Sequence, residues 1–507
     1  MDRGVIRRLI SIAVVVLPLG LGVVYGLVNL FAGWSWLFPG HDRAFYGLPP
    51  MGLDAPYGSV FLLCWASIAF FAGMALSKLE SRQLKLCATI FCVAVALRLA
   101  LPILFHDGMR PWSDFAQAWS RALGNPLVRD YHKYNPAWMN YALFLRGLAA
   151  IFGRHFTVDL LQGIVFDGAT AVGLFLAARE FTGNARTALT ASIMYAFNPS
   201  SVVYAMTASP EHGCIALFTF AWWTLFRGMR ADGVGHFLGW AVLTGLLAGF
   251  GNALKPFFPV FGTAAMFVFA LDLMERRDLP GRARAARFAM FLLVYAVELA
   301  VCRSVTFATE REFNEDLHSH QIASHYLCVG LHPDGEGQLG VSPKTRRWVE
   351  LVDAGTPRSE AGRIVAEELK DAWRNRLDEM PSFLLRKTIW TWQDDNRGFR
   401  YFSEKMGLQK LKRPRWRAEV FRQIRKNGPT LGQCWYLAMM SAALICAVKF
   451  CSRARKTPLG IVFAELLLLG FAGLMLLGEA QSRYKCLVLP AACVLAASAW
   501  RYDDLKE

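Results

Sequence analysis

The chain has 507 residues, of which 54% are hydrophobic and 19% charged, and its formal net charge is +16. Soluble proteins carry about 25% charged residues, so this composition disfavours a soluble globular enzyme. Apolar stretches of roughly 17 to 25 residues, the length that crosses a hydrocarbon core of about 30 Å, recur along most of the chain and predict an all-α integral membrane protein.

We expect about twelve transmembrane helices from these stretches. The first apolar stretch is too long for the core of a signal peptide and has no convincing cleavage site, so we interpret it as a retained helix. The expected helices lie near residues 8–33, 57–77, 85–106, 159–179, 187–206, 210–227, 236–254, 256–274, 287–308, 432–450, 458–478 and 482–500.

The loops predict the orientation of these helices. Cytoplasmic loops are enriched in Lys and Arg, and the N-terminal "MDRGVIRR" is basic, which places the N-terminus in the cytoplasm. Alternation from there puts the C-terminus in the cytoplasm as well. The five connections that alternation makes cytoplasmic are all basic, namely "SKLESRQLK", "REFTGNAR", "RGMRADG", "ERRDLPGRARAAR" and "KFCSRARKTP". Much of the excess positive charge lies in these short loops, which favours a plasma (inner) membrane topology over nucleic-acid binding.

Two long polar segments, 107–158 and 309–431, are then extracytoplasmic. The first contains "NPAWMNYALFLRGLAAIF", which we interpret as an interfacial amphipathic helix, since a thirteenth crossing would invert every later loop. The second is large enough for a small folded lobe, and its segment 384–393 is also amphipathic. Inside the membrane, Arg98, Asp167 and Glu298 are expected to pair across helices, because isolated charges are costly there.

Several charged residues must lie at the outer edge of the membrane because the adjacent apolar runs are short. Residues 486–500 span only about 22 Å as a helix, so the last crossing has to begin earlier and takes Arg483 and Tyr484 with it. The same count places Glu211 at the outer end of its helix, and Lys255 joins two helices with almost no loop. Taken singly, each could be an interfacial side chain that reaches for water. Together they would surround an anionic headgroup, since Arg offers a fork matched to phosphate and Lys a point charge.

Two acidic residues follow the third expected helix directly. Asp107 and Asp114 stand in "HDGMRPWSDFAQAWSRALGNP", and Asp114 opens a short helix. An acid in the first turn of a helix is favoured by the helix dipole alone. The functional alternative is a carboxylate that faces a cavity at the membrane surface and takes a proton from an acceptor nucleophile.

Three motifs together resemble the GT-C superfamily of membrane glycosyltransferases, in its bacterial protein-O-mannosyltransferase-like group. "WSDFAQAWSRALGNP" is similar to the acidic first-loop motif of that group, "NALKP" to its basic-residue–Pro pair, and "GEAQSRYKCLVLP" to its late E-x-Q-x-R-Y motif. The resemblance extends over residues 85–500. It implies a core at 85–308 with a catalytic loop at 107–158, preceded by two additional helices in 1–84. The lobe at 309–431 matches no motif, and 432–507 carries the E-x-Q-x-R-Y motif.

Carried over residue by residue, the resemblance makes Asp114 the catalytic carboxylate. It places Arg483 and Tyr484 near the phosphate of a polyprenyl-phosphate sugar, together with Lys255. Relatives commonly have Arg where Lys255 stands, which puts bidentate phosphate binding at this position in doubt. The remaining candidates, as contacts for the acceptor or for a divalent cation, are Glu211, His212, Glu479 and Asp107, and the metal requirement stays open.

The resulting hypothesis is a hexosyl- or pentosyltransferase that acts outside the cytoplasm with inversion at the anomeric carbon. Its partners would be a polyprenyl-phosphate-sugar donor, membrane lipids and a glycan, lipid or protein acceptor, but no nucleic acid. The alternatives are a twelve-span secondary transporter and a lipid-linked glycan polymerase or ligase. A transporter commonly shows inverted repeats and polar residues at the membrane midplane, whereas here no repeat is visible and the polar residues gather at one face.

Overall fold

The computed structural model describes residues 3–24, 27, 83–105, 113–127, 135–231, 234–276, 281–317, 322–338, 342–395, 398–399, 402, 415–452 and 457–499. Within these ranges every regular element is a helix, which confirms the all-α class. The expected helix at 57–77 lies outside the described residues, as does Asp107.

Eight helical segments in the described ranges are long and apolar enough to cross a membrane. The chain is therefore a multi-pass membrane protein, although this number does not confirm the expected twelve crossings. The segments are Val5–Val24, Gln83–Phe105, Phe156–Thr182, His236–Leu254, Phe258–Glu275, Arg284–Phe313, Trp416–Ser452 and Leu459–Leu477.

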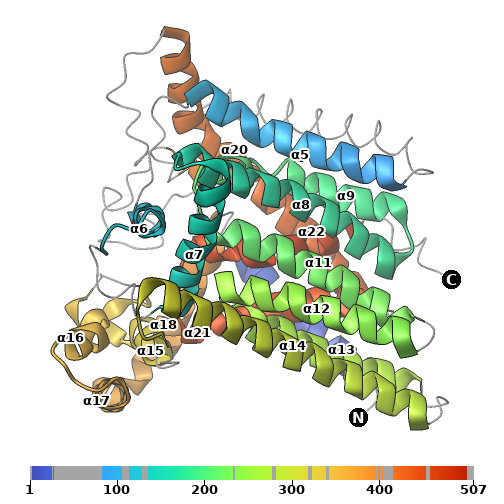
Figure 1. Ribbon diagram of the computed structural model, residues 1–507. Helices are drawn as coiled ribbons and strands as arrows, with labels where there is room; N and C mark the ends of the chain where they lie inside the picture. The colour runs from blue at the N-terminus through green and yellow to red at the C-terminus, as the bar shows by residue number, and fades with distance from the viewer. Residues whose placement is uncertain are drawn as a thin grey trace.

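The crossing helices lie side by side in a bundle whose two ends are the left and right sides of Figure 1. Their packing is continuous: α12 contacts both α11 and α14, α11 contacts α8, and α8 contacts α5 and α9. The bundle also includes α9 and α11, which are not among the eight segments above. The bounds of its helices are α1 Arg3–Val14, continued by a π-helical segment Val15–Gly20, α5 Gln83–Phe105, α8 Phe156–Thr182, α9 Ala185–Ala196, α11 Pro210–Arg230, α12 Val234–Leu254, α13 Phe258–Glu275, α14 Gly281–Phe313, α20 Arg415–Ser452 and α21 Leu459–Leu477.

The helix in the first long polar segment runs across the bundle rather than along it. This helix, α7 (Pro136–Phe152), crosses the ends of α12 and α14 (Figure 1). The Asn140 side chain fastens it there, since its amide donates to the Ala253 carbonyl over 3.1 Å and its carbonyl accepts from the Thr309 hydroxyl over 2.7 Å. The arrangement agrees with the expected interfacial helix. The preceding short helix, α6 (Ser113–Ala122), packs on α7.

Besides the first, which contains the π-helical segment Val15–Gly20, two of the expected crossings are not single α-helices. The segment 187–206 divides into α9 and α10 (Pro199–Tyr204), because the Asn198 side chain accepts from the Ser201 amide over 2.7 Å and caps a new helix. The segment 482–500 begins as a 3₁₀-helix, Ser482–Val488, and becomes α22 only at Leu489–Ser498. Both irregular stretches lie at the end of the bundle that faces the lobe, where they create the turns that carry polar residues.

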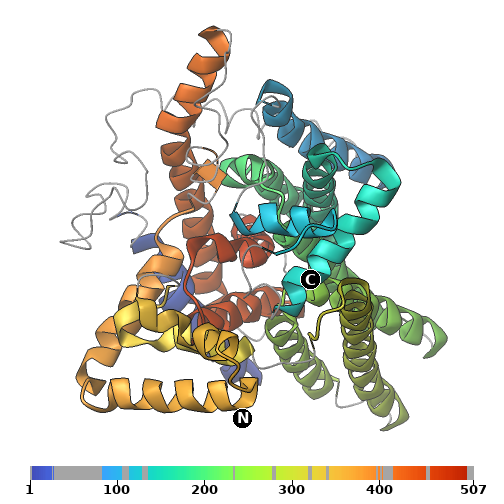
Figure 2. The same cartoon turned by 60° about the vertical axis from the view of Figure 1, so that its left-hand side comes forward.

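The lobe in the second polar segment is folded and lies beside the C-terminal segment, which is drawn in red in Figure 2. Its small core is built around the fully buried Trp348, against Cys328, Ala361 and Val365. The elements are α15 Ile322–Leu331, α16 Arg347–Asp353, α17 Arg358–Arg374 and α18 Met380–Trp392, with short 3₁₀-helices at Pro333–Gly335, Pro343–Arg346 and Leu377–Glu379.

Replacing Trp348 with Ala should destabilise the lobe, because the change leaves a large cavity in a core of only a few residues. We expect a loss of roughly 3–5 kcal/mol, the usual cost of truncating a buried Trp. Limited proteolysis of the purified protein should show faster cleavage within 309–431. The matched control is Trp416→Ala on α20, where the side chain is 54% exposed and the expected change is within about 0.5 kcal/mol. Equal protease resistance of the two variants would contradict this account of the lobe core.

Candidate functional site

A buried carboxylate meets a lysine where α11 begins and α12 ends. Ser209 caps α11: its hydroxyl accepts from the Glu211 amide over 3.2 Å and donates to the Glu211 carboxylate. Glu211 is 1% exposed, and its Oε1 lies 3.2 Å from Nζ of Lys255, the first residue after α12. The sequence predicted only that both residues stand near the outer membrane edge, whereas the fold pairs them directly.

The segment between α21 and α22, residues 478–488, is called the strap below. Its Tyr484 hydroxyl donates to Oε2 of Glu479 over 3.1 Å and accepts from Arg483 over 3.3 Å. The Gln481 amide donates to the other oxygen of Glu479. These contacts order the strap around its own Glu–Arg–Tyr motif.

Tyr484 joins the strap to the lysine. The Lys255 ammonium lies 4.5 Å from the centre of the Tyr484 ring, and the Arg483 guanidinium carbon lies 5.0 Å from the same centre. Both distances are within cation–π range. We name Glu211, Lys255, Glu479, Arg483 and Tyr484 the outer cluster. Two cations therefore gather around one aromatic ring, and one of them, Lys255, is also paired with the Glu211 carboxylate.

The lobe contributes a residue that the sequence analysis missed. Burial raises the pKa of Tyr326 on α15. Tyr484 and Glu479 raise it further, while Lys255 and Arg483 oppose the shift, so Tyr326 lies near the outer cluster. The Asn135 amide, at the start of α7, donates to the Tyr326 hydroxyl over 2.9 Å. No motif surrounds Tyr326 in the sequence, so only the docking of the lobe reveals its place.

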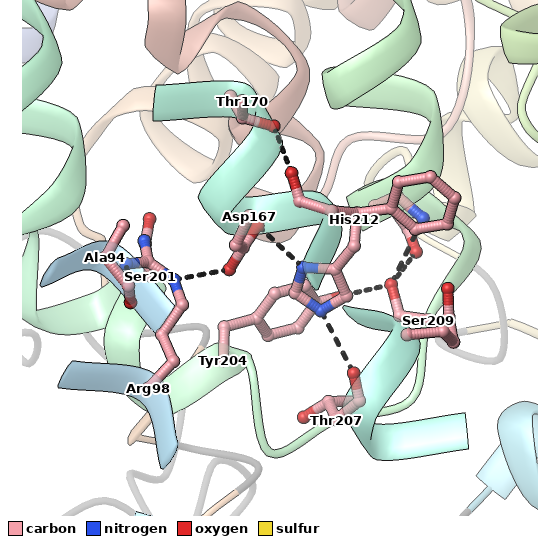
Figure 3. Close-up of polar contacts among 12 residues, drawn as sticks. Ala94, Arg98, Asp167, Thr170, Ser201, Tyr204, Thr207, Ser209 and His212 are labelled. Carbon is pink, nitrogen blue, oxygen red and sulfur yellow. Dashed lines mark hydrogen bonds and ion pairs between the residues drawn. The ribbon is translucent and has the colours of Figure 1, made fainter. Parts of the chain in front are cut away.

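His212 lies in a buried network with Asp167 and Thr207 (Figure 3). Its Nδ1 lies 3.0 Å from an oxygen of Asp167, and its Nε2 lies 3.1 Å from the Thr207 carbonyl oxygen. A carboxylate and a carbonyl can only accept hydrogen bonds, so both ring nitrogens carry a proton in this arrangement. The second oxygen of Asp167 accepts from Nε of Arg98 over 2.7 Å, which confirms the expected pairing of these two charges across helices.

The position of the His212 ring favours a glycine at position 163, and its contacts restrict the role of His212. A Cβ at Gly163 of α8 would lie 3.1 Å from Cδ2 of His212, so the glycine leaves room for the imidazole ring. With both nitrogens engaged, His212 would have to give up a bond in order to hold an acceptor or a cation. The geometry favours a supporting role, in which His212 holds the Thr207 turn that leads to Ser209 and Glu211.

Asp114 stands on its own short element. It lies in the first turn of α6 and is partly exposed, while Ala118, Trp119 and Ala122 of the same helix pack toward α7. The helix α7, on which α6 packs, is hydrogen-bonded through Asn140 to Ala253 at the end of α12. Lys255 follows Ala253 by two residues, so α7 and Lys255 are attached to the same end of α12. The catalytic role of Asp114 stays a prediction.

In the parts of the chain that the structure describes, no group of three or more His, Cys, Asp and Glu side chains is placed to hold a metal ion.

Glu298, the third intramembrane charge, accepts from the Asn252 amide of α12 over 2.8 Å, as a pairing across helices requires.

Comparison with known proteins found a family model that matches part of the helical bundle. Residues 137–304 match the family model described as dolichyl-phosphate-mannose-protein mannosyltransferase. The resemblance to GT-C glycosyltransferases is confirmed. The matched residues run from α7 through α14 and so include Glu211 and Lys255, whereas Asp114 and the strap lie outside them. No curated protein sequence matches the chain.

Two solved structures show a distant likeness. One is the archaeal oligosaccharyltransferase AglB from Archaeoglobus fulgidus, in complex with an inhibitory peptide and a dolichol-phosphate, with 12% identity and a TM-score of 0.41. The alignment covers 82% of this chain, which spans half the length of that protein. The other is ArnT from Cupriavidus metallidurans bound to undecaprenyl phosphate, with 12% identity, a TM-score of 0.36, and coverage of 81% of this chain and 77% of that one. At these scores no residue role is transferred from either structure.

Proposed function

We propose that the chain is a membrane glycosyltransferase that moves a sugar from a polyprenyl-phosphate donor to an acceptor on the extracytoplasmic side. The observation that carries the proposal is the outer cluster, in which Lys255 and Arg483 converge on the Tyr484 ring at one end of the membrane bundle. A phosphate attached to a lipid tail has its charge at this depth. The family match over 137–304 supports the reaction class.

The cluster suits a phosphate that arrives and leaves. In the structure the Lys255 charge is paired with Glu211, and Arg483 donates to the Tyr484 hydroxyl, so both side chains are held in place without the donor. A donor phosphate would replace the Glu211 carboxylate as the partner of Lys255. Arg483 would add charge-assisted hydrogen bonds, which are the stronger kind.

The reaction balances without a further reagent. Asp114 would accept the proton of the acceptor hydroxyl, whose oxygen attacks the anomeric carbon from the face opposite the phosphate. The new glycosidic bond forms as the bond between the sugar and the phosphate oxygen breaks, and the configuration inverts. The polyprenyl phosphate leaves with the electron pair, and Lys255 and Arg483 stabilise its added negative charge.

Reconstitution tests the proposal. The purified full chain would be placed in proteoliposomes with radiolabelled polyprenyl-phosphate mannose and, in parallel, with other polyprenyl-phosphate sugars, together with an extract of envelope glycans, lipids and proteins. We expect label to move from the lipid to one acceptor fraction. Solute uptake without any transfer of label would contradict the proposal and favour a transporter.

A further inference from the structure

A buried lysine of the lobe holds the end of α21. Lys387 on α18 is 1% exposed, and its ammonium donates to the carbonyl oxygens of Leu476 over 2.7 Å and of Gly478 over 2.9 Å. Its third hydrogen bond goes to the Gly330 carbonyl near the end of α15. A lysine ammonium has three donors, and all three are used here.

The position of this ammonium follows from helix chemistry. The last carbonyls of a helix have no partner within it, and the helix dipole makes that end negative. Lys387 stands where α15 and α21 both end, so one cation serves two helix ends. Burial lowers the pKa of Lys387 to about 7, and the negative charge of Glu479 opposes that shift.

Two further contacts bind the same part of the strap to the lobe. The Ala480 amide donates to the Gly337 carbonyl over 2.8 Å. Gly330 approaches the strap so closely that a Cβ there would lie 2.5 Å from the Gly478 carbonyl oxygen. The strap therefore begins in a conformation that the lobe imposes, one residue before Glu479.

A short chain of contacts leads from Lys387 to the two cations of the outer cluster. Lys387 holds Gly478, the next residue is Glu479, and Glu479 accepts from the Tyr484 hydroxyl. The Tyr484 ring in turn contacts Lys255 and Arg483. We propose that Lys387 is a positioning residue for the donor phosphate, which it serves by holding the strap in the conformation that brings Arg483 and Tyr484 to Lys255. The inference rests on the proposed function and gives the lobe a role in donor binding.

Undecaprenyl phosphate is the probe that tests this role. Wild-type protein and the Lys387→Met variant, both as full chains in nanodiscs, would be titrated with it, and the donor KM and kcat measured in the transfer assay. We expect the Kd and the donor KM to rise about tenfold or more, because three carbonyls lose their donor and the strap relaxes. The kcat at saturating donor should stay within about threefold, since Lys387 touches no reacting group.

Trp373→Phe is the matched control. The Trp373 indole donates to the Leu331 carbonyl over 2.7 Å, so this variant also removes a hydrogen bond at the end of α15, but none to the strap. It should lower the melting temperature and leave the Kd unchanged. Gly330→Ala approaches the strap from the other side: its methyl group should displace Gly478 and raise the Kd although Lys387 is intact. If Lys387→Met does not fold, the Kd of Gly330→Ala tests the positioning role by itself.

The outcomes separate the two proposals. Wild-type affinity for undecaprenyl phosphate in both Lys387→Met and Gly330→Ala would overturn the positioning role alone. A loss of thermal stability in Lys387→Met, with the Kd of the folded protein unchanged as in Trp373→Phe, would also overturn it, because that is the result of a purely structural contact. Failure of the wild-type chain to bind undecaprenyl phosphate would overturn the proposed function and this inference with it.

Discussion

Asp114→Asn should abolish most sugar transfer while leaving the protein folded and able to bind its donor. The amide is close in size to the carboxylate but cannot accept the proton of the attacking hydroxyl. Loss of a general base typically costs about 10²- to 10⁴-fold in rate. Since Asp114 is partly exposed in the first turn of α6, we expect its replacement by the amide to have little effect on stability.

The measurement is the kcat for transfer from a radiolabelled polyprenyl-phosphate sugar, with the donor KM determined alongside. We expect kcat to fall and KM to change little, because a base acts in the transition state rather than in donor binding. Asp371→Asn on α17 is the control, since it makes the same chemical change at a side chain that is 70% exposed. Full activity of Asp114→Asn would remove the base assignment, whatever the behaviour of the control.

Arg483→Ala should act on the donor instead. Its guanidinium supplies hydrogen bonds to an anionic partner, each worth about 1.5–3 kcal/mol, so the donor KM should rise roughly 10- to 100-fold. Loss of Arg483 also removes a contact with Tyr484, whose ring faces Lys255. Arg483→Ala would therefore weaken donor binding in two ways, through the loss of the guanidinium and through the loss of its contact with Tyr484.

Arg483→Lys separates charge from geometry. A lysine keeps the positive charge but not the planar fork, so the donor KM should fall between the wild-type and Arg483→Ala values. Arg374→Ala, at a side chain that is 71% exposed on α17, controls for the loss of a positive charge elsewhere. An unchanged donor KM in Arg483→Ala would contradict the phosphate role of the strap.

Hydropathy allowed the sequence to predict an all-helical membrane protein, while the orientation that loop charge indicates stays a prediction. These are local properties: the length of an apolar run decides whether a helix can span the bilayer, and it does not depend on the neighbouring helices. The same arithmetic placed Arg483 and Tyr484 at the membrane edge. Local patterns did not reveal that 482–500 begins as a 3₁₀-helix, because a 3₁₀-turn leaves the hydropathy unchanged.

Only the tertiary structure decided which polar residues meet. The pairing of Lys255 with Glu211 depends on how α11 packs on α12, and the contact of His212 with Asp167 depends on how α11 packs on α8. Lys387 and Gly478 are 91 residues apart in the chain, and no motif links them. Contacts of this kind arise from the packing of helices against one another, which hydropathy and spacing do not encode. The sequence could therefore predict an all-helical membrane protein with a small lobe and nominate site residues, but not the contacts by which the lobe meets the strap.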